Sequence, residues 1–393
     1  MVDPVPEQHA LPAVAREVSK LLGLPVQSGH GMDVLINGDE IFPAMLQAIA
    51  GARREICFET FIYWSGDIAQ RFASALSDAE RRGVSVYVLL DWWGAQEMDE
   101  HLIEQMRDAG VLVRHFNPLR WWQLQRMNYR THRKILVVDE EVAFTGGVGI
   151  AEEWCGNARG PHEWYDLHYR MTGPAVGEMR AAFAEVWSEV LQQPCLPAAS
   201  TLSSSPKQAG GDAAQVLSSA PRSGSERVYE LFRYAIESAT DSFLVITAYF
   251  VPDRETIAAL IAAVKRGVSV QVMVPGPHID SQVVRYSSRS SWGELLQAGV
   301  RIHVFTPTML HAKATIVDSE WVIVGSANFD NRSFALNDEI LVNVFSDAFA
   351  AAHSAIFREN LVRCEALDYD RWRKRGALTR VKEFFSDLLR PQL

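Results

Sequence analysis

Hydrophobic residues recur along this chain with two different periods. Helical spacing in residues 68–81 and 255–265 predicts amphipathic helices there. Short runs of mainly β-branched and aliphatic residues predict strands at 84–90, 135–138, 268–274 and 315–317. Because helices alternate with strands in this order, the pattern indicates sheets covered by helices, which is an α/β fold.

The same pattern occurs twice. The segment AIAGARREICFETF at 48–61 resembles AIESATDSFLVITA at 235–248, and the pentapeptide RGVSV occurs at both 82–86 and 266–270. The copies keep their order, at offsets of 187 and 184 residues. We therefore interpret the chain as two homologous units that arose by internal duplication.

The segment between the two units, residues 192–227, is rich in Pro, Ser and Gly, a composition typical of a linker. We expect the first α/β domain at 35–191 and the second at 228–365. Residues 1–34 are expected to form an N-terminal extension, and residues 366–393 a basic amphipathic C-terminal helix.

Each unit carries the motif H-x-K-x4-D-x6-G-[GS]. The first copy consists of His132, Lys134, Asp139, Gly146 and Gly147. The second copy consists of His311, Lys313, Asp318, Gly325 and Ser326, with Asn328 two residues further on. On a strand, side chains at i and i+2 project to the same face, which places each imidazole beside a cation. Two copies that met between the units would supply two His and two Lys to one site.

Such a site suits a phosphate-like anion. One imidazole can attack phosphorus as a nucleophile, while the other protonates the leaving alcohol and activates the incoming one. The lysines, and backbone N–H groups at Gly146, Gly147, Gly325 and Ser326, would stabilise charge on the non-bridging oxygens. A histidine-based metal site is the alternative, but a protonated lysine is not a ligand and no HExxH spacing is present. We therefore expect neither metal nor cofactor.

The paired motifs in a duplicated α/β chain resemble the phospholipase D superfamily over about residues 35–365. The layout is most similar to bacterial cardiolipin synthases of the short form, which lack N-terminal transmembrane helices. The resemblance implies two α/β/α sandwich domains with one active site at their interface. It also implies a phospholipase D-type phosphatidyltransferase with six motif residues in the site: a nucleophile and acid/base pair (His132, His311), two phosphate-binding lysines (Lys134, Lys313) and two supporting acids (Asp139, Asp318).

The family further places an acidic residue after each motif, where it orients that motif's imidazole. Glu339 fits this role for the second motif and Asp166 for the first. The family's usual G-S-x-N sequence is kept as GSAN at 325–328 but reads GGVG at 146–149. Loss of both polar side chains from the first copy predicts unequal roles for the two halves.

Charge is distributed unevenly along the chain. The chain has 38 basic and 48 acidic residues, which gives a net charge of −10. This excludes the extended basic surface of a general nucleic-acid-binding protein, and we expect no nucleic-acid partner.

Ten residues just before the first motif have no counterpart in the second half. They fall in a basic aromatic loop that contains Arg120, Trp121, Trp122, Arg126 and Arg130. Such a loop favours contact with anionic lipid headgroups, and the alternative is a buried Trp pair.

The C-terminal segment 371–393 carries seven Lys or Arg against two acidic residues. Its apolar residues at helical spacing are Leu378, Val381, Phe384, Phe385, Leu388 and Leu389. This pattern is typical of a helix that binds an anionic membrane surface, and the alternative is a terminal helix packed on the core.

The sequence shows neither a secretory signal nor a bilayer-length apolar run, and its four cysteines lie far apart. We expect peripheral association with the cytoplasmic face of the cell membrane.

These observations and the resemblance together predict a phosphatidyl transferase that forms cardiolipin. The substrates would be phosphatidylglycerol and a second phospholipid, joined through a covalent phosphohistidine. A phospholipase D that yields phosphatidic acid, a phosphodiesterase or nuclease of the same superfamily, and a non-catalytic lipid-binding relative are the alternatives. The sequence decides neither which His is the nucleophile nor the oligomeric state.

Overall fold

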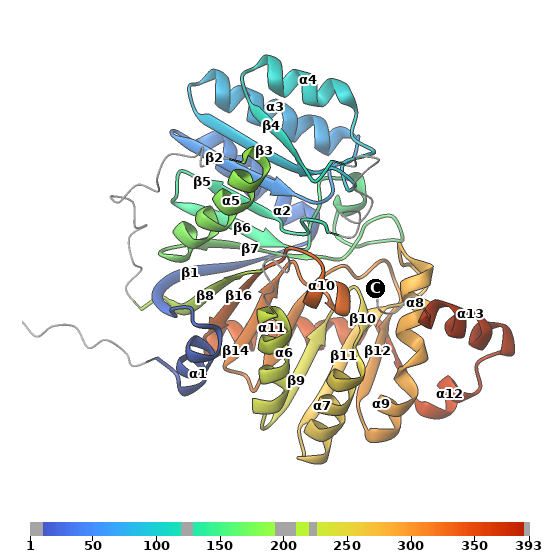
Figure 1. Cartoon of the computed structure of the whole chain (residues 1–393). Coiled ribbons are helices and arrows are strands. Elements are labelled where there is room, and N and C mark those ends of the chain that lie inside the picture. Colours follow the sequence, from blue (N-terminus) through green and yellow to red (C-terminus); the bar gives the residue numbers. More distant parts are fainter. Residues whose placement is uncertain (1–10, 119–128, 193–209, 220–225, 389–393) are drawn as a thin grey trace, which may run out of the picture.

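The computed structural model describes residues 11–118, 129–192, 210–219 and 226–388. Within these residues, 15 strands form one continuous sheet that runs through the whole molecule (Figure 1). A separate parallel pair consists of β10 (Phe250–Val251) and β15 (Phe329–Asp330). The α/β class predicted from the hydrophobic pattern is confirmed.

The main elements of the first half are β1 (Gln27–Ile36), α2 (Asn37–Gly51), β2 (Glu55–Thr60), α3 (Asp67–Arg81), β3 (Ser85–Asp91), α4 (Glu100–Asp108), β4 (Leu112–Phe116), β5 (Ile135–Val138), β6 (Val142–Gly146), the 3-10 turn η2 (Glu152–Trp154), β7 (Leu167–Thr172) and α5 (Ala175–Leu191). Those of the second half are β8 (Asp212–Ser218), α6 (Arg227–Ser238), β9 (Ser242–Ile246), α7 (Arg254–Lys265), β11 (Ser269–Pro275), α8 (Gln282–Ser290), α9 (Trp292–Ala298), β12 (Arg301–Phe305), β13 (Ala314–Val317), β14 (Trp321–Gly325), α10 (Asn331–Ala335), β16 (Ile340–Phe345) and α11 (Asp347–Leu361). The helices and strands predicted from periodicity all form.

The strand order reflects the duplication. Outward from the centre it reads β1-β7-β6-β5-β2-β3-β4 in the first half and β8-β16-β14-β13-β9-β11-β12 in the second. The halves meet where β1 pairs antiparallel with β8, with Gln27 opposite Ala214 and Ser28 opposite Ala213. Both halves are therefore parts of one hydrogen-bonded sheet.

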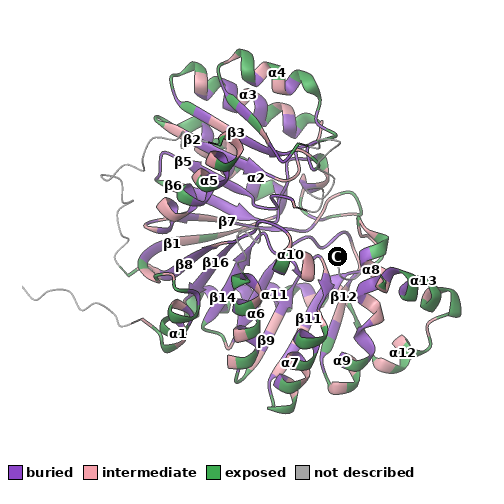
Figure 2. Ribbon diagram, in the orientation of Figure 1, coloured by how far each residue is buried: buried purple, intermediate pink, exposed green. Residues whose placement is uncertain are grey.

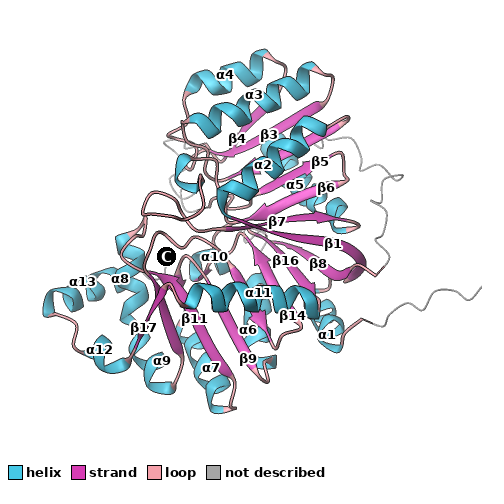
Figure 3. Ribbon diagram, turned by 180° about the vertical axis from the view of Figure 1, so that it is seen from behind, coloured by secondary structure: helices cyan, strands magenta, loops and turns pink. Residues whose placement is uncertain are grey.

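The hydrophobic core also joins the halves. One cluster of buried residues lies under α5 and α11 and includes Phe183 from the first half and Phe357 from the second. Two other clusters belong to one half each, beneath α2, α3 and α4 and beneath α6, α7 and α9. The strands are buried while the helices expose their outer sides, and helices flank the sheet in front and behind (Figures 2 and 3). Removing water from this shared apolar surface fixes the two halves against one another.

Three expected segments differ from the structure. The extension 1–34 contains α1 (Ala13–Leu22), which packs on α6, and most of the central strand β1. The expected linker 192–227 contains β8, whose buried Gln215 donates to the Leu24 carbonyl and thereby ties this strand to the N-terminal segment. The C-terminal segment contains two helices, α12 (Tyr369–Arg373) and α13 (Ala377–Asp387), separated at Gly376, and follows the edge strand β17 (Cys364–Leu367).

Candidate active site

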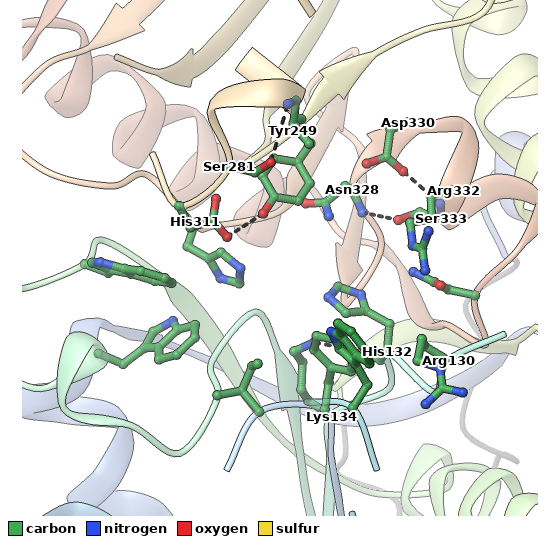
Figure 4. A pocket seen from close by; sticks show the side chains of 18 of the residues that line it. Arg130, His132, Lys134, Tyr249, Ser281, His311, Asn328, Asp330, Arg332 and Ser333 are labelled. Carbon is green, nitrogen blue, oxygen red and sulfur yellow. Dashed lines mark hydrogen bonds between the residues drawn. The ribbon is translucent and has the colours of Figure 1, made fainter. Parts of the chain in front are cut away.

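The two motif histidines face one pocket between the halves. Its volume is about 500 Å³, and both His132 and His311 line it, together with Lys134 (Figure 4). The His–Lys pairs immediately precede β5 and β13 instead of lying within them. Arg133, between His132 and Lys134, is fully buried and donates to the carbonyls of Ala182 and Ser219. The side chains of residues 132–134 therefore alternate in direction as expected, although each strand starts one residue after the motif lysine.

Each motif is held in place by backbone contacts with the opposite half. A parallel bridge joins Thr131 to Asp338, and His132 N donates to the Asp338 carbonyl at 2.9 Å. An equivalent bridge joins Leu310 to Tyr165, and His311 N donates to the Tyr165 carbonyl at 2.7 Å. In both cases the bridge lies one residue before a motif histidine and one residue before an acidic side chain.

This arrangement produces crossed histidine–carboxylate pairs. His132 Nδ1 lies 3.0 Å from both carboxylate oxygens of Glu339, and His311 Nδ1 lies 2.8 Å from Asp166 Oδ2. The expectation that each acid orients the histidine of its own half was wrong. The reason is geometric, because each acid-bearing segment pairs with the motif segment across the interface. Neither half alone therefore contains a motif histidine together with the carboxylate that orients it.

The crossed pairs set the protonation of both imidazoles. Each carboxylate accepts from Nδ1–H, which leaves the Nε2 lone pair available at the pocket. Burial lowers the pKa of His132 to about 4 and also lowers the pKa of His311, so both rings are neutral at pH 7. Burial alone would raise the pKa of both acids, but the facing histidines hold the pKa of Asp166 and Glu339 below the ordinary range. Neutral imidazoles therefore lie beside ionised carboxylates.

Both motif lysines are buried beside the histidines. Lys134 Nζ donates to the His132 carbonyl at 2.8 Å, and Lys313 Nζ lies 3.1 Å from His311 Nδ1 and 3.3 Å from its Nε2. Burial lowers the pKa of Lys134 to about 7 and that of Lys313 to about 8. Arrival of a phosphate anion would stabilise the ammonium form of each, so both groups are suited to bind one.

The motif aspartates lie outside this pocket, which corrects their assignment to the catalytic set. Asp139 and Asp318 occupy left-handed positions in the tight turns that follow β5 and β13, with φ of 56° and 50°. The Asp139 carboxylate accepts from the backbone N–H groups of Arg53, Arg54 and Glu55 at 2.7–2.9 Å. Asp318 does the same at residues 240–242. Each aspartate thus fixes the start of the neighbouring strand, at the end of β5 or β13 opposite the histidine.

Two of the backbone N–H groups that were expected to bind phosphate donate to carbonyl groups of the protein instead. Gly147 N donates to the Leu167 carbonyl at 3.2 Å, and Ser326 N donates to the Ile340 carbonyl at 2.9 Å. Gly146 and Gly325 have φ of 154° and 140°, within the region that favours glycine. A Cβ at Gly147 would collide with the Asp166 carboxylate. Gly147 therefore makes room for Asp166, and the N–H groups of Gly147 and Ser326 are bonded within the protein.

The two carboxylates are held by different donors. In the second half, the Ser326 hydroxyl donates to Glu339 Oε2 and accepts from Ile340 N. In the first half, where glycine replaces this serine, Trp154 Nε1 donates to Asp166 Oδ2 at 2.8 Å. The Trp154 ring also packs edge-on against His311, with centroids 5.1 Å apart. Trp154 therefore replaces the missing hydroxyl, and the sequence comparison of the halves did not reveal it.

The other predicted residues divide into three groups. Asn328 is buried and lines the pocket, as a phosphate-binding residue should. Arg130 also lines the pocket but is not an exposed loop residue: it is 5% exposed, and its guanidinium lies 3.4 Å from Asp91 Oδ1. Arg120, Trp121, Trp122 and Arg126 lie outside the described residues.

The walls of the pocket differ in character, which the motifs did not predict. The first half contributes an apolar wall, formed by Phe61, Ile62, Trp64, Trp93, Trp154 and Trp164. The second half contributes a polar wall, formed by Tyr249, Asp280, Ser281, Asn328, Asp330, Arg332, Ser333 and Asn337. The pocket is therefore amphipathic.

The residues that the structure describes contain no group of three or more His, Cys, Asp or Glu side chains arranged to hold a metal ion. No helix in the same ranges has the length and hydropathy needed to cross a membrane.

Comparisons with known proteins show which proteins this chain resembles. A family model described as "Cardiolipin synthase, PLD-like domain" matches residues 45–159 and 232–361. Cardiolipin synthase A of Pseudomonas fluorescens (strain SBW25) is 35% identical over 339 residues, which cover 86% of this chain and 70% of that protein. Cardiolipin synthase of Geobacillus kaustophilus (strain HTA426) is 33% identical over 372 residues, covering 94% and 74%.

A solved structure shares the fold. Phosphatidylserine synthase of Haemophilus influenzae Rd KW20 superimposes with a TM-score of 0.72 at 14% sequence identity, over 97% of this chain and 100% of that one. The match supports the two-half architecture.

We predict that Trp154→Phe lowers kcat about tenfold with little change in KM. Phenylalanine keeps a ring near His311 but removes the donor to Asp166, and a hydrogen bond to a charged group contributes about 1.5–3 kcal/mol. The matched variant Ser326→Ala removes the donor to Glu339 and should have a similar effect. Steady-state kinetics, with thermal unfolding to verify folding, test this; wild-type kcat in Trp154→Phe would contradict it.

We also predict that phospholipid affinity falls as the pH rises from 7 to 9. Without bound substrate, Lys134 and Lys313 have pKa values of about 7 and about 8. The ammonium form, which binds the anion, is therefore present below these values and is lost above them. KM for a short-chain phosphatidylglycerol, measured below its micelle concentration, should increase at least about tenfold over this range. Lys134→Met should raise KM at pH 7 and flatten the profile. A wild-type KM that does not change with pH would refute phosphate binding by these two lysines.

Proposed function

The chain belongs to the family of cardiolipin synthases with phospholipase D-like domains, and we propose that it makes cardiolipin from phosphatidylglycerol and a second phospholipid. The observation that carries this proposal is the single pocket with two motif histidines, each oriented by a carboxylate of the other half. The names of the relatives support cardiolipin synthesis by phosphatidyl transfer. The choice of phosphatidylglycerol is our own inference.

The first half-reaction forms a phosphohistidine. Nε2 of one histidine attacks the phosphorus of the donor lipid while the bond from phosphorus to the headgroup oxygen breaks. The other histidine, protonated as the anionic substrate binds, gives its Nε2 proton to the departing alcohol. We assign stabilisation of the negative charge on the non-bridging oxygens to Lys134 and Asn328, which line the pocket, and to Lys313, which lies beside His311.

The second half-reaction runs the same chemistry in reverse with a new alcohol. The histidine that gave up its proton now accepts one from the primary hydroxyl of the second lipid. That oxygen attacks phosphorus as the phosphorus–nitrogen bond breaks, which releases cardiolipin and restores both imidazoles. Glu339 and Asp166 stabilise each imidazolium while it exists, because they lie within hydrogen-bond distance of Nδ1.

Phospholipase D activity is the second candidate, because water can replace the lipid alcohol without any change in the residues. The apolar wall favours transfer, since Trp64, Trp93 and Trp164 cover one side of the site with aromatic surface and thereby limit water around the phosphohistidine.

We predict that the purified protein converts labelled phosphatidylglycerol in mixed micelles into cardiolipin and free glycerol, and does so in the presence of EDTA. His132→Ala and His311→Ala should each reduce turnover more than about 1000-fold, because each removes one of two cooperating groups. Products are separated by chromatography. Phosphatidic acid as the main product would instead indicate hydrolysis, and full activity in either variant would refute the shared two-histidine site.

The protein must also reach its lipid substrates, and we propose that α13 docks on an anionic bilayer. This helix packs on α8 through its polar side: Glu383 is 2% exposed and pairs with Arg375 at 2.6 Å and Arg289 at 3.5 Å. Its apolar side chains are 51–70% exposed, namely Leu378, Val381, Phe384, Phe385 and the adjoining Leu388. A helix packed on a core would show the opposite arrangement. Leu389 lies outside the described residues.

The surroundings of α13 match an anionic lipid surface. α13 and the residues just before it also carry exposed basic side chains, namely Arg371, Arg373, Lys374, Arg380 and Lys382. Helix α8, on which α13 lies, contributes Val284 to the pocket, and Figure 1 shows the two helices side by side. Trp93, also at the pocket, is 55% exposed. Docking by this face would bring the bilayer close to the pocket. The cytoplasmic face of the cell membrane remains our prediction for this surface.

We predict that the double variant Phe384→Ser with Phe385→Ser binds phosphatidylglycerol-containing vesicles at least about tenfold more weakly than wild type. Both rings are exposed, so their loss removes burial in lipid without opening the core. Val362→Ser, at an 87% exposed residue next to α11, is the matched control and should bind normally. Vesicle co-sedimentation measures this. Unchanged binding, or a concentration-dependent dimer that the variant abolishes, would contradict bilayer docking.

A further inference from the structure

The polar wall of the pocket contains acidic groups that the phosphate chemistry does not use. Asp330 is 3% exposed, lines the pocket and lies at the N-terminus of α10, where it accepts from Ser333 N at 2.8 Å. Asp280 lines the same wall and accepts from the Tyr249 hydroxyl. Arg332 lines the same wall, but a carboxyl group is a poor partner for a phosphate anion, so we assign the two acidic groups to a different part of the substrate.

A buried carboxamide points to the same conclusion. Asn337 is 6% exposed and lines this wall, and its Oδ1 has no hydrogen-bond partner among the described residues. A buried acceptor without a donor costs free energy, so a ligand that supplies a donor would bind with advantage. Burial also raises the pKa of Asp330 to about 7, which shows how little water reaches this carboxyl.

We propose that Tyr249, Asp280, Asp330 and Asn337 form a subsite for the headgroup alcohol, and that the subsite selects an alcohol with several hydroxyl groups, such as glycerol. The inference rests on the proposed phosphatidyl transfer and names the substrate group that faces the polar wall. Hydroxyl groups donate to carboxylate and carboxamide oxygens, which are the groups that this wall presents. The same subsite holds the glycerol that leaves the donor lipid and the glycerol hydroxyl of the incoming one.

Most aromatic side chains of the pocket lie on the opposite wall, away from these polar groups. Quaternary ammonium groups such as choline are bound by aromatic rings that surround the cation. Five of the six residues of the apolar wall are aromatic, but they lie on the first-half side and leave a single aromatic residue, Tyr249, among the polar ones. We therefore assign the acyl-bearing glycerol backbone to the apolar wall and the headgroup to the polar wall.

The test is headgroup exchange with free alcohols. Purified protein is given a labelled phosphatidyl donor with glycerol or ethanol as acceptor, and kcat/KM is measured for each. Wild type should prefer glycerol to ethanol. Asp330→Asn should lower the glycerol-to-ethanol ratio about tenfold, and Asp280→Asn, at an exposed residue, should lower it several-fold.

The matched control is Asp253→Asn. Asp253 also caps a helix, accepting from Thr256 N at 2.7 Å at the start of α7, but it does not line the pocket. Asparagine retains capping ability at both positions, so the pair isolates the effect of the carboxylate on the ligand. The control should keep the wild-type ratio.

The outcomes separate the subsite from the reaction. An unchanged glycerol-to-ethanol ratio in both pocket variants, or a wild-type preference for ethanol over glycerol, overturns the subsite even if cardiolipin is formed. Preferential exchange of glycerol without cardiolipin formation supports the subsite and refutes the proposed function. Transfer to neither alcohol overturns the subsite, and the absence of cardiolipin as well overturns both.

Discussion

The active site depends on the hydrogen bonds between each motif histidine and a carboxylate of the opposite half. A distance of 2.8–3.0 Å across the interface requires the two halves to be held to within a fraction of an ångström. The parallel bridges beside His132 and His311, the central β1–β8 pairing and the core beneath α5 and α11 together provide that constraint. The duplicated fold therefore positions the catalytic groups as a consequence of how its halves join.

The duplicated halves have diverged around this common centre. Ser326 supports Glu339 in the second half, whereas Trp154 supports Asp166 in the first, where Gly147 leaves space for the carboxylate. One half supplies aromatic surface and the other polar groups, so two similar folds enclose an amphipathic pocket. This division matches a phospholipid, which presents an apolar part and a polar headgroup on either side of its phosphate. Equivalent histidines thus lie in unequal surroundings, as the differing G-[GS] sequences predict.

Much of this could be predicted from the sequence, because repeated patterns report local structure and duplicated chemistry. The α/β class followed from the hydrophobic pattern, and the internal duplication followed from the repeated segments. The meeting of His132 with His311 followed from the paired motifs and the family resemblance. The crossed acids could not, since Asp166 and Glu339 find their partners only through inter-half bridges that leave no local pattern. Asp139 was misassigned because its place in the motif does not reveal that its carboxylate points to backbone amides behind the pocket. β8 was missed because it lies between Ser- and Pro-rich stretches whose composition is typical of a linker.

The most direct test of the crossed arrangement is nuclear magnetic resonance of the protein with 15N-labelled histidine. His132→Ala and His311→Ala assign the two sets of ring nitrogens, and Glu339→Gln and Asp166→Asn then perturb one pair at a time. We predict that Glu339→Gln shifts the Nδ1 signal of His132 and leaves that of His311 nearly unchanged, while Asp166→Asn does the reverse. If each acid variant instead shifts the histidine of its own half, the crossed site is contradicted.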